Sequence, residues 1–238
     1  MKQTISLETN FQDGVILLID KPYGWTSFNV VSKVRSLIRK STGIKKIKVG
    51  HAGTLDPLAT GLLVICTGKA TKQVERLLAE TKEYIATFTI GATTPSFDME
   101  TQKDMDYPIK HITKELVDKI VLNFIGDQMQ TPPLYSAKFV GGKRAYEYAR
   151  KGKNIEIKPV QISIYKMELL DFNPPYLKFH IKCSKGTYIR SLARDLGYAL
   201  GSGEYLSELQ RIRSGEFHLK DAISLDSFEE IIQTNATG

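Results

Sequence analysis

Hydrophobic residues recur along the chain with two spacings, one typical of strands and one typical of helices. An unbroken apolar run predicts a buried strand over 14–20, and apolar positions every three or four residues predict a helix over 27–40. The same patterns predict strands over 62–68, 82–91, 160–172 and 176–186, and helices over 70–80, 113–124, 187–201 and 224–233. A further short helix and a strand are expected between residues 201 and 224.

These elements predict an α+β fold. Strands and helices alternate irregularly, and hairpin-like strand pairs indicate a mixed or largely antiparallel central sheet flanked by helices. Two segments lack periodicity: residues 92–108, expected to be a surface loop, and residues 131–144, an irregular segment rich in proline, glycine and lysine that leads into a short helix over 145–152. We expect one domain over residues 1–215 and a short acidic segment over residues 216–238.

Composition excludes several classes of protein. The 238 residues are 42% hydrophobic and 25% charged, and no apolar run is long enough to span a bilayer, so a cytoplasmic protein without membrane contact is expected. Cys66 and Cys183 lie in apolar surroundings and are expected to be buried and reduced. The four histidines are too far apart in sequence for a metal pair, so no metal is expected.

Charge narrows the range of partners. The net charge is +7, and because residues 216–238 hold one lysine and five acidic residues, residues 1–215 carry +11. Cationic clusters at 45–48, 141–153 and 210–213 are interpreted as mixtures of cations with aromatic residues or glycines. This mixture favours a polyanion with bases to stack on over a surface that serves solubility alone.

One carboxylate stands out in the stretch GHAGTLDPLATG at residues 50–61. By local rules Asp56 caps a short helical turn, Pro57 takes its first position and Gly61 ends it. Arg190 is the second such residue: it lies in the first turn of a helix predicted to be capped by Thr187, where the helix dipole disfavours a cation. An anion beside Arg190 is therefore expected, and Asp56 is an economical candidate.

Five motifs in order resemble those of the TruB-type tRNA pseudouridine-55 synthases. They are KPYGWTS at 21–27, GHAGTLDPLATGLL at 50–63, KEYIATFTIG at 82–91, TPPLYSAKFVGGKRAYEYARKG at 131–152 and CSKGTYIRSLARDLG at 183–197. The resemblance implies the pseudouridine synthase fold with an RNA-gripping insertion at about 130–152. It also implies a uridine isomerase, in which the base is detached from C1′ of its ribose, turned and rejoined through C5.

The resemblance assigns roles to individual residues. Asp56 is implied to be the essential nucleophile or base, with Arg190 keeping it ionised, and Tyr84 to stack on the extruded base. His51 is implied to fill the space beside the flipped nucleotide, and Leu209 to line the pocket. Substrate binding is assigned to His51, Lys21, Pro22, Leu209, Tyr188, Lys138, Lys143 and Arg144. No cofactor is expected, because substrate and product are isomers.

The expected partner is tRNA, recognised at its T-arm stem-loop by a monomer without an obligatory protein partner.

Two departures from the family pattern affect RNA contacts. Phe139 stands where the family usually has lysine, with Lys138 one place earlier, which leaves that phosphate contact open. The family match ends near Gly215, so the RNA-binding PUA domain of many relatives is expected to be missing.

Two other functions compete with this interpretation. An RNA chaperone or particle scaffold of the same fold would have no need of Asp56, Tyr84 and Arg190 together. A carboxylate glycosidase would require a second acid, which the motifs do not supply. Within the favoured reaction, three roles of Asp56 stay open: attack at C6 of the base, attack at C1′, or removal of a ribose proton.

Overall fold

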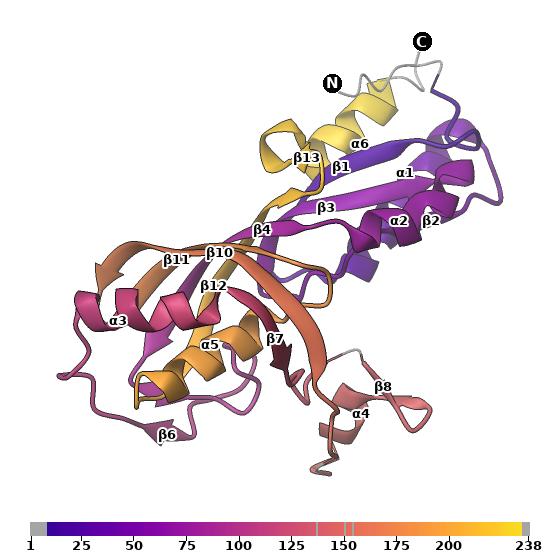
Figure 1. The fold of residues 1–238 in the computed structure, drawn as a ribbon. Coiled ribbons are helices and arrows are strands. Elements are labelled where there is room, and N and C mark those ends of the chain that lie inside the picture. Colours follow the sequence, from indigo (N-terminus) through magenta and orange to yellow (C-terminus); the bar gives the residue numbers. More distant parts are fainter. Residues whose placement is uncertain (1–8, 137, 150, 154, 235–238) are drawn as a thin grey trace. The chain divides into compact units, whose positions relative to one another are not determined.

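The computed structural model describes residues 9–136, 138–149, 151–153 and 155–234 (Figure 1). The chain forms two compact units, the first made of residues 1–83 and 210–238 and the second of residues 84–209. It passes from one unit to the other within strand β4 (Lys82–Ile90) and again within strand β12 (Glu204–Ser214). The first unit is therefore built from both ends of the chain.

The first unit packs helices on strands. Its elements are β1 (Ile16–Lys21), α1 (Ser27–Thr42), β2 (Val49–His51), β3 (Ala59–Thr67), the 3-10 helix η1 (Gly68–Gln73), α2 (Val74–Ala79), β13 (Phe217–His218), the 3-10 helix η3 (Leu219–Asp221) and α6 (Leu225–Thr234). Strands β1 and β2 both pair antiparallel with β3, and β13 pairs antiparallel with the end of β12.

Strand β3 is buried on both faces, which explains its continuous apolar sequence. Leu63 and Ile65 point into a core shared with α1 and α6. Leu62, Val64 and Cys66 point the other way, into a second core shared with η1 and α2. Because strand side chains alternate between faces, a strand covered on both sides needs apolar residues at every position.

The acidic C-terminal segment is part of the first unit. Leu225, Phe228 and Ile232 of α6 are buried in the same core as α1. Outside that core, Lys33 of α1 forms an ion pair of 2.6 Å with Glu229 of α6. One face of α6 thus packs while its acids remain on the outer side.

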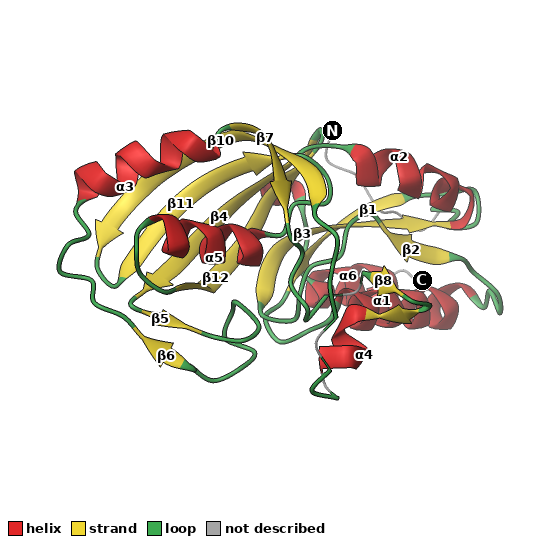
Figure 2. Cartoon of the chain, turned by 60° about the horizontal axis from the view of Figure 1, so that its bottom comes forward, coloured by secondary structure: helices red, strands yellow, loops and turns green. Residues whose placement is uncertain are grey.

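The second unit has a sheet with strand order β4-β11-β10-β7, in which β11–β10 and β10–β7 are antiparallel (Figure 2). Phe88 of β4 and Phe179 of β11 stack with ring centroids 5.1 Å apart. The other elements of this unit are β5 (Ala92–Thr93), β6 (Met105–Asp106), α3 (Lys114–Val121), the 3-10 helix η2 (Leu122–Phe124), β7 (Gly126–Gln130), β8 (Phe139–Val140), β9 (Lys143–Arg144), α4 (Ala145–Ala149), β10 (Val160–Asn173), β11 (Tyr176–Cys183) and α5 (Ile189–Ala199).

Most predicted elements are present, with three corrections. The helix predicted over 70–80 is divided into the 3-10 helix η1 and the α-helix α2. The short helix expected before the strand after residue 201 is wrong, because β12 begins at Glu204 and only the 3-10 turn η3 follows it. The segment over 131–144 is not irregular throughout, since it contains the β8–β9 hairpin, whereas the short helix predicted directly after it is present as α4. No helix in the described ranges is long and apolar enough to cross a membrane.

The packing of α6 makes a testable prediction. Phe228 is fully buried, so Phe228→Ala leaves a cavity in the core of the first unit and is expected to lower its free energy of unfolding by about 3–5 kcal/mol. The single tryptophan, Trp25, lies in this unit and reports its unfolding in urea by fluorescence. Lys220→Ala, at an exposed position, is the control and should change stability by less than about 0.5 kcal/mol. An equal effect of both substitutions would contradict the packing.

Candidate active site

Asp56 lies in the loop between β2 and β3, and no helix begins there. Pro57 and Leu58 form a turn, in which the Ala59 amide donates to the Asp56 carbonyl at 3.1 Å, and β3 starts at Ala59. The predicted helical turn over 56–61 is therefore wrong. Gly61 is not a helix cap but a strand residue with φ 96°, where a Cβ atom would lie 2.5 Å from the Arg211 carbonyl oxygen. Strand pairing overrides the local helix signals.

The loop is hydrogen-bonded on both sides of Asp56. The Ser27 hydroxyl, at the start of α1, accepts from the Leu55 amide at 2.8 Å and donates to the Leu55 carbonyl at 3.0 Å. The Gly24 amide donates to the Pro57 carbonyl at 2.9 Å. The residues immediately before and after Asp56 are thus tied to the β1–α1 segment, which holds the carboxylate on a defined backbone.

Lys21 supports this loop as a buried cation. Its ammonium group donates to the carbonyls of Pro22 at 2.9 Å, Trp25 at 2.6 Å and Pro57 at 3.2 Å, and the residue is 0% exposed. Burial lowers the pKa of Lys21 to about 8, the Asp56 carboxylate raises this pKa, and the Arg211 cation lowers it. Lys21 is therefore mainly charged at pH 7 and uses its three donors on backbone. Its predicted contact with substrate, and that of exposed Pro22, stay predictions.

Arg211 is a second buried cation under the loop, and sequence reasoning missed its role. It is 1% exposed, and its guanidinium donates to the Leu62 carbonyl at 2.7 Å and the Gly53 carbonyl at 3.0 Å. Gly53 has φ 108°, and a Cβ atom there would lie 3.3 Å from Arg211 Nη1. The cationic cluster at 210–213 predicts a surface for a polyanion, which is wrong for Arg211.

His51 closes β2 just before this loop. Burial lowers the pKa of His51, a backbone hydrogen bond to Gly53 raises it, and the Arg211 cation lowers it further. With its pKa below the ordinary value, the imidazole is neutral at pH 7. A neutral ring can stack and donate one hydrogen bond, which is what its predicted role requires.

Three aromatic side chains beside the same loop have no distinguishing signal in the sequence. Tyr23, Trp25 and Phe28 are 62%, 37% and 67% exposed, respectively. They belong to the β1–α1 segment that is hydrogen-bonded to Leu55 and Pro57. Apolar rings held open to solvent on a fixed segment form a surface suited to stacking on bases.

Arg190 lies in the second unit, in the first turn of α5. The N-cap of α5 is Tyr188 and not Thr187, whose hydroxyl instead donates to the Ser184 carbonyl at 3.0 Å. The expected anion is present within this unit: Arg190 Nη1 lies 3.3 Å from Asp98 Oδ2, and both side chains are buried. The predicted pairing of Arg190 with Asp56 joins residues of different units and stays a prediction.

The segment that carries Asp98 differs at its centre from the surface loop that the sequence predicts. Thr94, Ser96 and Asp98 are buried, and the Thr94 hydroxyl donates to the Asp98 carbonyl at 2.7 Å. Phe97 between them has φ 62°, a conformation that bulky residues rarely adopt. The only sequence signal for this turn is the alternation of threonine, serine and aspartate at positions 94, 96 and 98.

Arg190 also joins this turn to the first part of the insertion. Its guanidinium donates to the Ser96 carbonyl at 3.3 Å and to the Tyr135 carbonyl at 3.0 Å. Nearby, Gln130 at the end of β7 exchanges two hydrogen bonds with the backbone of Tyr188, at 2.8 and 3.1 Å. The start of α5 therefore anchors the insertion at Gln130 and Tyr135, in its first part.

Tyr84 and Leu209 are the first and last residues of the second unit. Tyr84 is 8% exposed on β4, and Leu209 is half-buried on β12. Their predicted stacking and pocket-lining roles stay predictions.

The insertion presents cations and an aromatic ring on a hairpin. Gly141 and Gly142, with φ of 57° and 82°, form the turn between β8 and β9, as tight hairpins require. The Arg144 guanidinium lies 4.5 Å from the centroid of the Phe139 ring, which is 62% exposed, and Lys143 is exposed. The Lys138 ammonium group donates to the Lys158 carbonyl at 3.0 Å, and so links the insertion to the chain segment that follows it.

The described residues offer no cluster of three or more histidine, cysteine, aspartate or glutamate side chains that could hold a metal. Cys66 and Cys183 are both free and buried, and burial raises the pKa of the Cys66 thiol to about 11. The reactive groups around Asp56 in the first unit are thus a carboxylate, two buried cations and a neutral imidazole.

The electrostatic link between Lys21 and Asp56 can be tested directly. The pKa of the Lys21 ammonium, measured by NMR titration, is expected near 8 and should fall in Asp56→Asn, because the Asp56 carboxylate raises it. Asp13→Asn, at an exposed position paired with Lys69, is the control and should leave the pKa of Lys21 unchanged. An unchanged or higher pKa in Asp56→Asn would contradict the geometry.

Comparison with known proteins places the chain in a family. The family model described as TruB family pseudouridylate synthase (N terminal domain) matches residues 39–189, and that of the tRNA pseudouridylate synthase B C-terminal domain matches residues 190–237. Proteins named tRNA pseudouridine synthase B are similar over most of the chain. That of Phocaeicola vulgatus is 56% identical over 221 residues, covering 93% of this chain and 94% of the relative, and that of Bacteroides thetaiotaomicron is 52% identical over 227 residues, covering 94% and 95%.

Among solved structures, a chain of a Cbf5–Nop10–Gar1 complex is similar with a TM-score of 0.70 and 29% identity over 95% of this chain. A chain of an H/ACA RNP bound to a substrate RNA has a TM-score of 0.64 and 28% identity over 92% of this chain. This chain spans 56% and 53% of the lengths of those two chains. With family models matched from residue 39 to residue 237 and relatives more than half identical, the chain belongs to the TruB family of pseudouridylate synthases.

Proposed function

We propose that this enzyme converts uridine 55 in the T-loop of tRNA to pseudouridine, with Asp56 as the group that starts the reaction. The observation that carries the proposal is the single carboxylate on a loop fixed by Lys21, Ser27 and Arg211, in a chain of the TruB family. Its similar relatives bear the name tRNA pseudouridine synthase B, which supports tRNA as the substrate.

The reaction balances without an external reagent. The bond between N1 of the uracil and C1′ of the ribose breaks, a bond between C5 and C1′ forms, and the proton on C5 is replaced by one on N1. Product and substrate are isomers, so the protein needs to supply only an activating carboxylate, a base-holding pocket and a proton path. Asp56 supplies the first, and Tyr84 is proposed to stack on the base and assist proton removal at C5.

The base must leave the RNA stack to reach Asp56, which costs a few kcal/mol of unstacking. We assign His51 to the space that the flipped nucleotide leaves, because its low pKa keeps the ring neutral and able to stack. Leu209 and Tyr188 are assigned to the pocket. Lys138, Lys143 and Arg144 of the insertion are assigned to the RNA backbone, with Phe139 available for stacking on a base.

The proposed partner is the T-arm stem-loop of tRNA. The exposed aromatic residues Tyr23 and Trp25 beside the loop of Asp56 support a nucleic-acid partner over an acidic protein. We propose that the enzyme acts as a monomer in the cytoplasm without an obligatory protein partner. Because an RNA-binding scaffold or a glycosidase need not exchange the C5 proton, proton loss from C5 separates the three functions.

Asp56→Asn tests the role of the carboxylate. The substitution should abolish tritium release from tRNA labelled at uridine C5, while tRNA affinity stays equal or improves, because a negative charge facing phosphates is removed and the shape is kept. Asp13→Asn is the matched control, expected to release tritium at the wild-type rate. More than trace release by an Asp56→Asn protein free of deamidation would overturn the assignment.

Arg190→Lys tests the buried guanidinium. Lysine cannot reproduce a planar group that reaches Asp98 and the Tyr135 carbonyl together, so kcat/KM for tRNA should fall about a hundredfold or more, equivalent to about 2.7 kcal/mol. Arg76→Lys, an exposed arginine of α2, should keep wild-type kinetics. A wild-type rate in Arg190→Lys would show that two-point binding is not needed.

A further inference from the structure

A groove of about 560 Å³ lies along the second half of α1 and the loop that follows it. Its lining residues are Ser32, Arg35, Ser36, Arg39, Lys40, Gly43, Ile44 and Lys45. Four of these are cations and none is acidic. The groove lies wholly within the first unit and none of the residues assigned above to catalysis or substrate binding lines it.

The cationic surface continues beyond this groove. A second hollow of about 250 Å³ is lined by Gln12, Lys46, Ile47, Lys48, Gly68, Lys69, Thr71 and Lys72, again without an acid. Lys45 of the first groove and Lys46 of the second are neighbours in sequence. We call the two together the α1 groove, which contains eight cations from three segments of the chain.

Most of these cations have no acidic partner. Of the eight, and counting only described residues, Lys69 alone has a carboxylate within ion-pair distance, that of Asp13 at 2.7 Å. Arg35 donates to the Val49 carbonyl at 3.1 Å, which orients the guanidinium but leaves its charge uncompensated. Acidic side chains are available in the same unit on α6, yet Glu229 pairs with Lys33 outside the groove. The two signs of charge are therefore segregated.

Helix capping accounts for only part of this arrangement. Arg39 and Lys40 occupy the last turn of α1, where cations are favoured by the helix dipole. The dipole acts within about one turn and does not explain Lys46, Lys48 and Lys72, which belong to other segments. A concave surface with uncompensated positive charge from several segments is suited to a polyanion.

The position of the groove relative to the Asp56 loop favours the substrate of Asp56 as the polyanion that binds there. The hydroxyl of Ser27, in the first turn of α1, is hydrogen-bonded to the backbone of Leu55, the residue before Asp56. Phe28, Ser32, Arg35 and Arg39 follow at helical spacing on one face, and the rise of 1.5 Å per residue puts Arg39 about 17 Å along the axis from Phe28. The face thus runs from the exposed aromatic ring of Phe28 near the loop to exposed cations farther away.

We propose that the α1 groove binds the sugar-phosphate backbone of the substrate RNA, several nucleotides away from the uridine that is isomerised. The proposal rests on the proposed function for the identity of the RNA. The RNA would then contact two surfaces: the insertion of the second unit, as proposed above, and the α1 groove of the first unit. Binding there contributes to affinity and not to chemistry, because the groove does not contain Asp56.

The test neutralises three exposed groove cations in Arg39→Gln/Lys40→Gln/Lys45→Gln. The expected result is a KM for tRNA at least about tenfold higher near physiological salt, with kcat at saturating tRNA within about twofold of wild type. The slope of log affinity against log salt concentration should fall by about 0.7–0.9 for each phosphate that the variant no longer neutralises. Both changes follow from fewer counterions released on binding.

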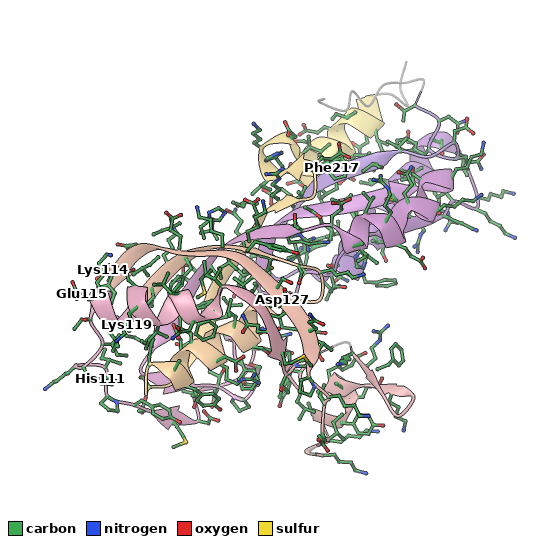
Figure 3. All side chains as sticks on the ribbon, viewed as in Figure 1. His111, Lys114, Glu115, Lys119, Asp127 and Phe217 are labelled. Carbon is green, nitrogen blue, oxygen red and sulfur yellow. The ribbon has the colours of Figure 1, made fainter. Side chains whose placement is uncertain are left out.

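The matched control removes the same charge elsewhere, in Lys110→Gln/Lys119→Gln/Lys220→Gln, all exposed and outside the groove. Figure 3 labels Lys119 on α3. This control should keep the wild-type KM and salt slope. The charge-preserving variant Arg39→Lys/Lys40→Arg/Lys45→Arg should also bind as wild type does, which guards against a folding defect in the neutralised variant.

Unchanged KM and salt slope in the neutralised variant would overturn the proposal, as would an equal loss of affinity in the matched control. Weaker retention on heparin with unchanged tRNA affinity would overturn it as well, since the groove would then be a general cationic surface. The proposed function fails separately, if wild-type protein releases no tritium from tRNA. In that case the Kd for tRNA, measured by filter binding, still decides the groove, and an unchanged Kd overturns it.

Discussion

The fold of the first unit around Asp56 depends on two buried cations that hydrogen-bond to the Asp56 loop and to the β1–α1 segment and β3 beside it. Lys21 and Arg211 are 0% and 1% exposed, and together they donate to five carbonyl oxygens. An irregular loop packed against a core has carbonyls that no strand or helix can satisfy, and leaving one unpaired costs about 1–3 kcal/mol. Charged donors meet that need, because the carbonyl oxygens that accept from them replace part of the hydration that the cations lose on burial.

In the second unit, Arg190 likewise donates hydrogen bonds to carbonyls of irregular backbone. Its guanidinium ties a tight turn and the entry to the insertion to the start of α5, and Asp98 balances its charge. In both units a buried cation rigidifies irregular backbone that carries proposed chemistry. Around Asp56, the buried cations Lys21 and Arg211 donate hydrogen bonds to backbone carbonyls, and the Asp56 carboxylate also raises the pKa of Lys21.

The first unit contains two groups of cations, one buried and one exposed. The buried cations hold the loop, whereas the exposed cations of the α1 groove face solvent and have few acidic partners among the described residues. The acids of the C-terminal segment lie on α6, whose apolar face completes the core under α1. A chain of modest net charge can therefore present a strongly positive surface, which suits the proposed RNA substrate.

Local pattern alone determined the long elements: α1, β4, β10 and β11 follow from side-chain spacing, because a face buried in the core imposes its period on the sequence. The five motifs likewise identified the family. Tertiary structure decided the rest. Asp56 carries every signal of a helix cap, yet pairing of β3 with β1 from Gly61 onward replaces the helix. The local pattern does not predict that Asp98 is ion-paired or that Arg211 is buried, because the partners of both lie more than ninety residues away in the chain.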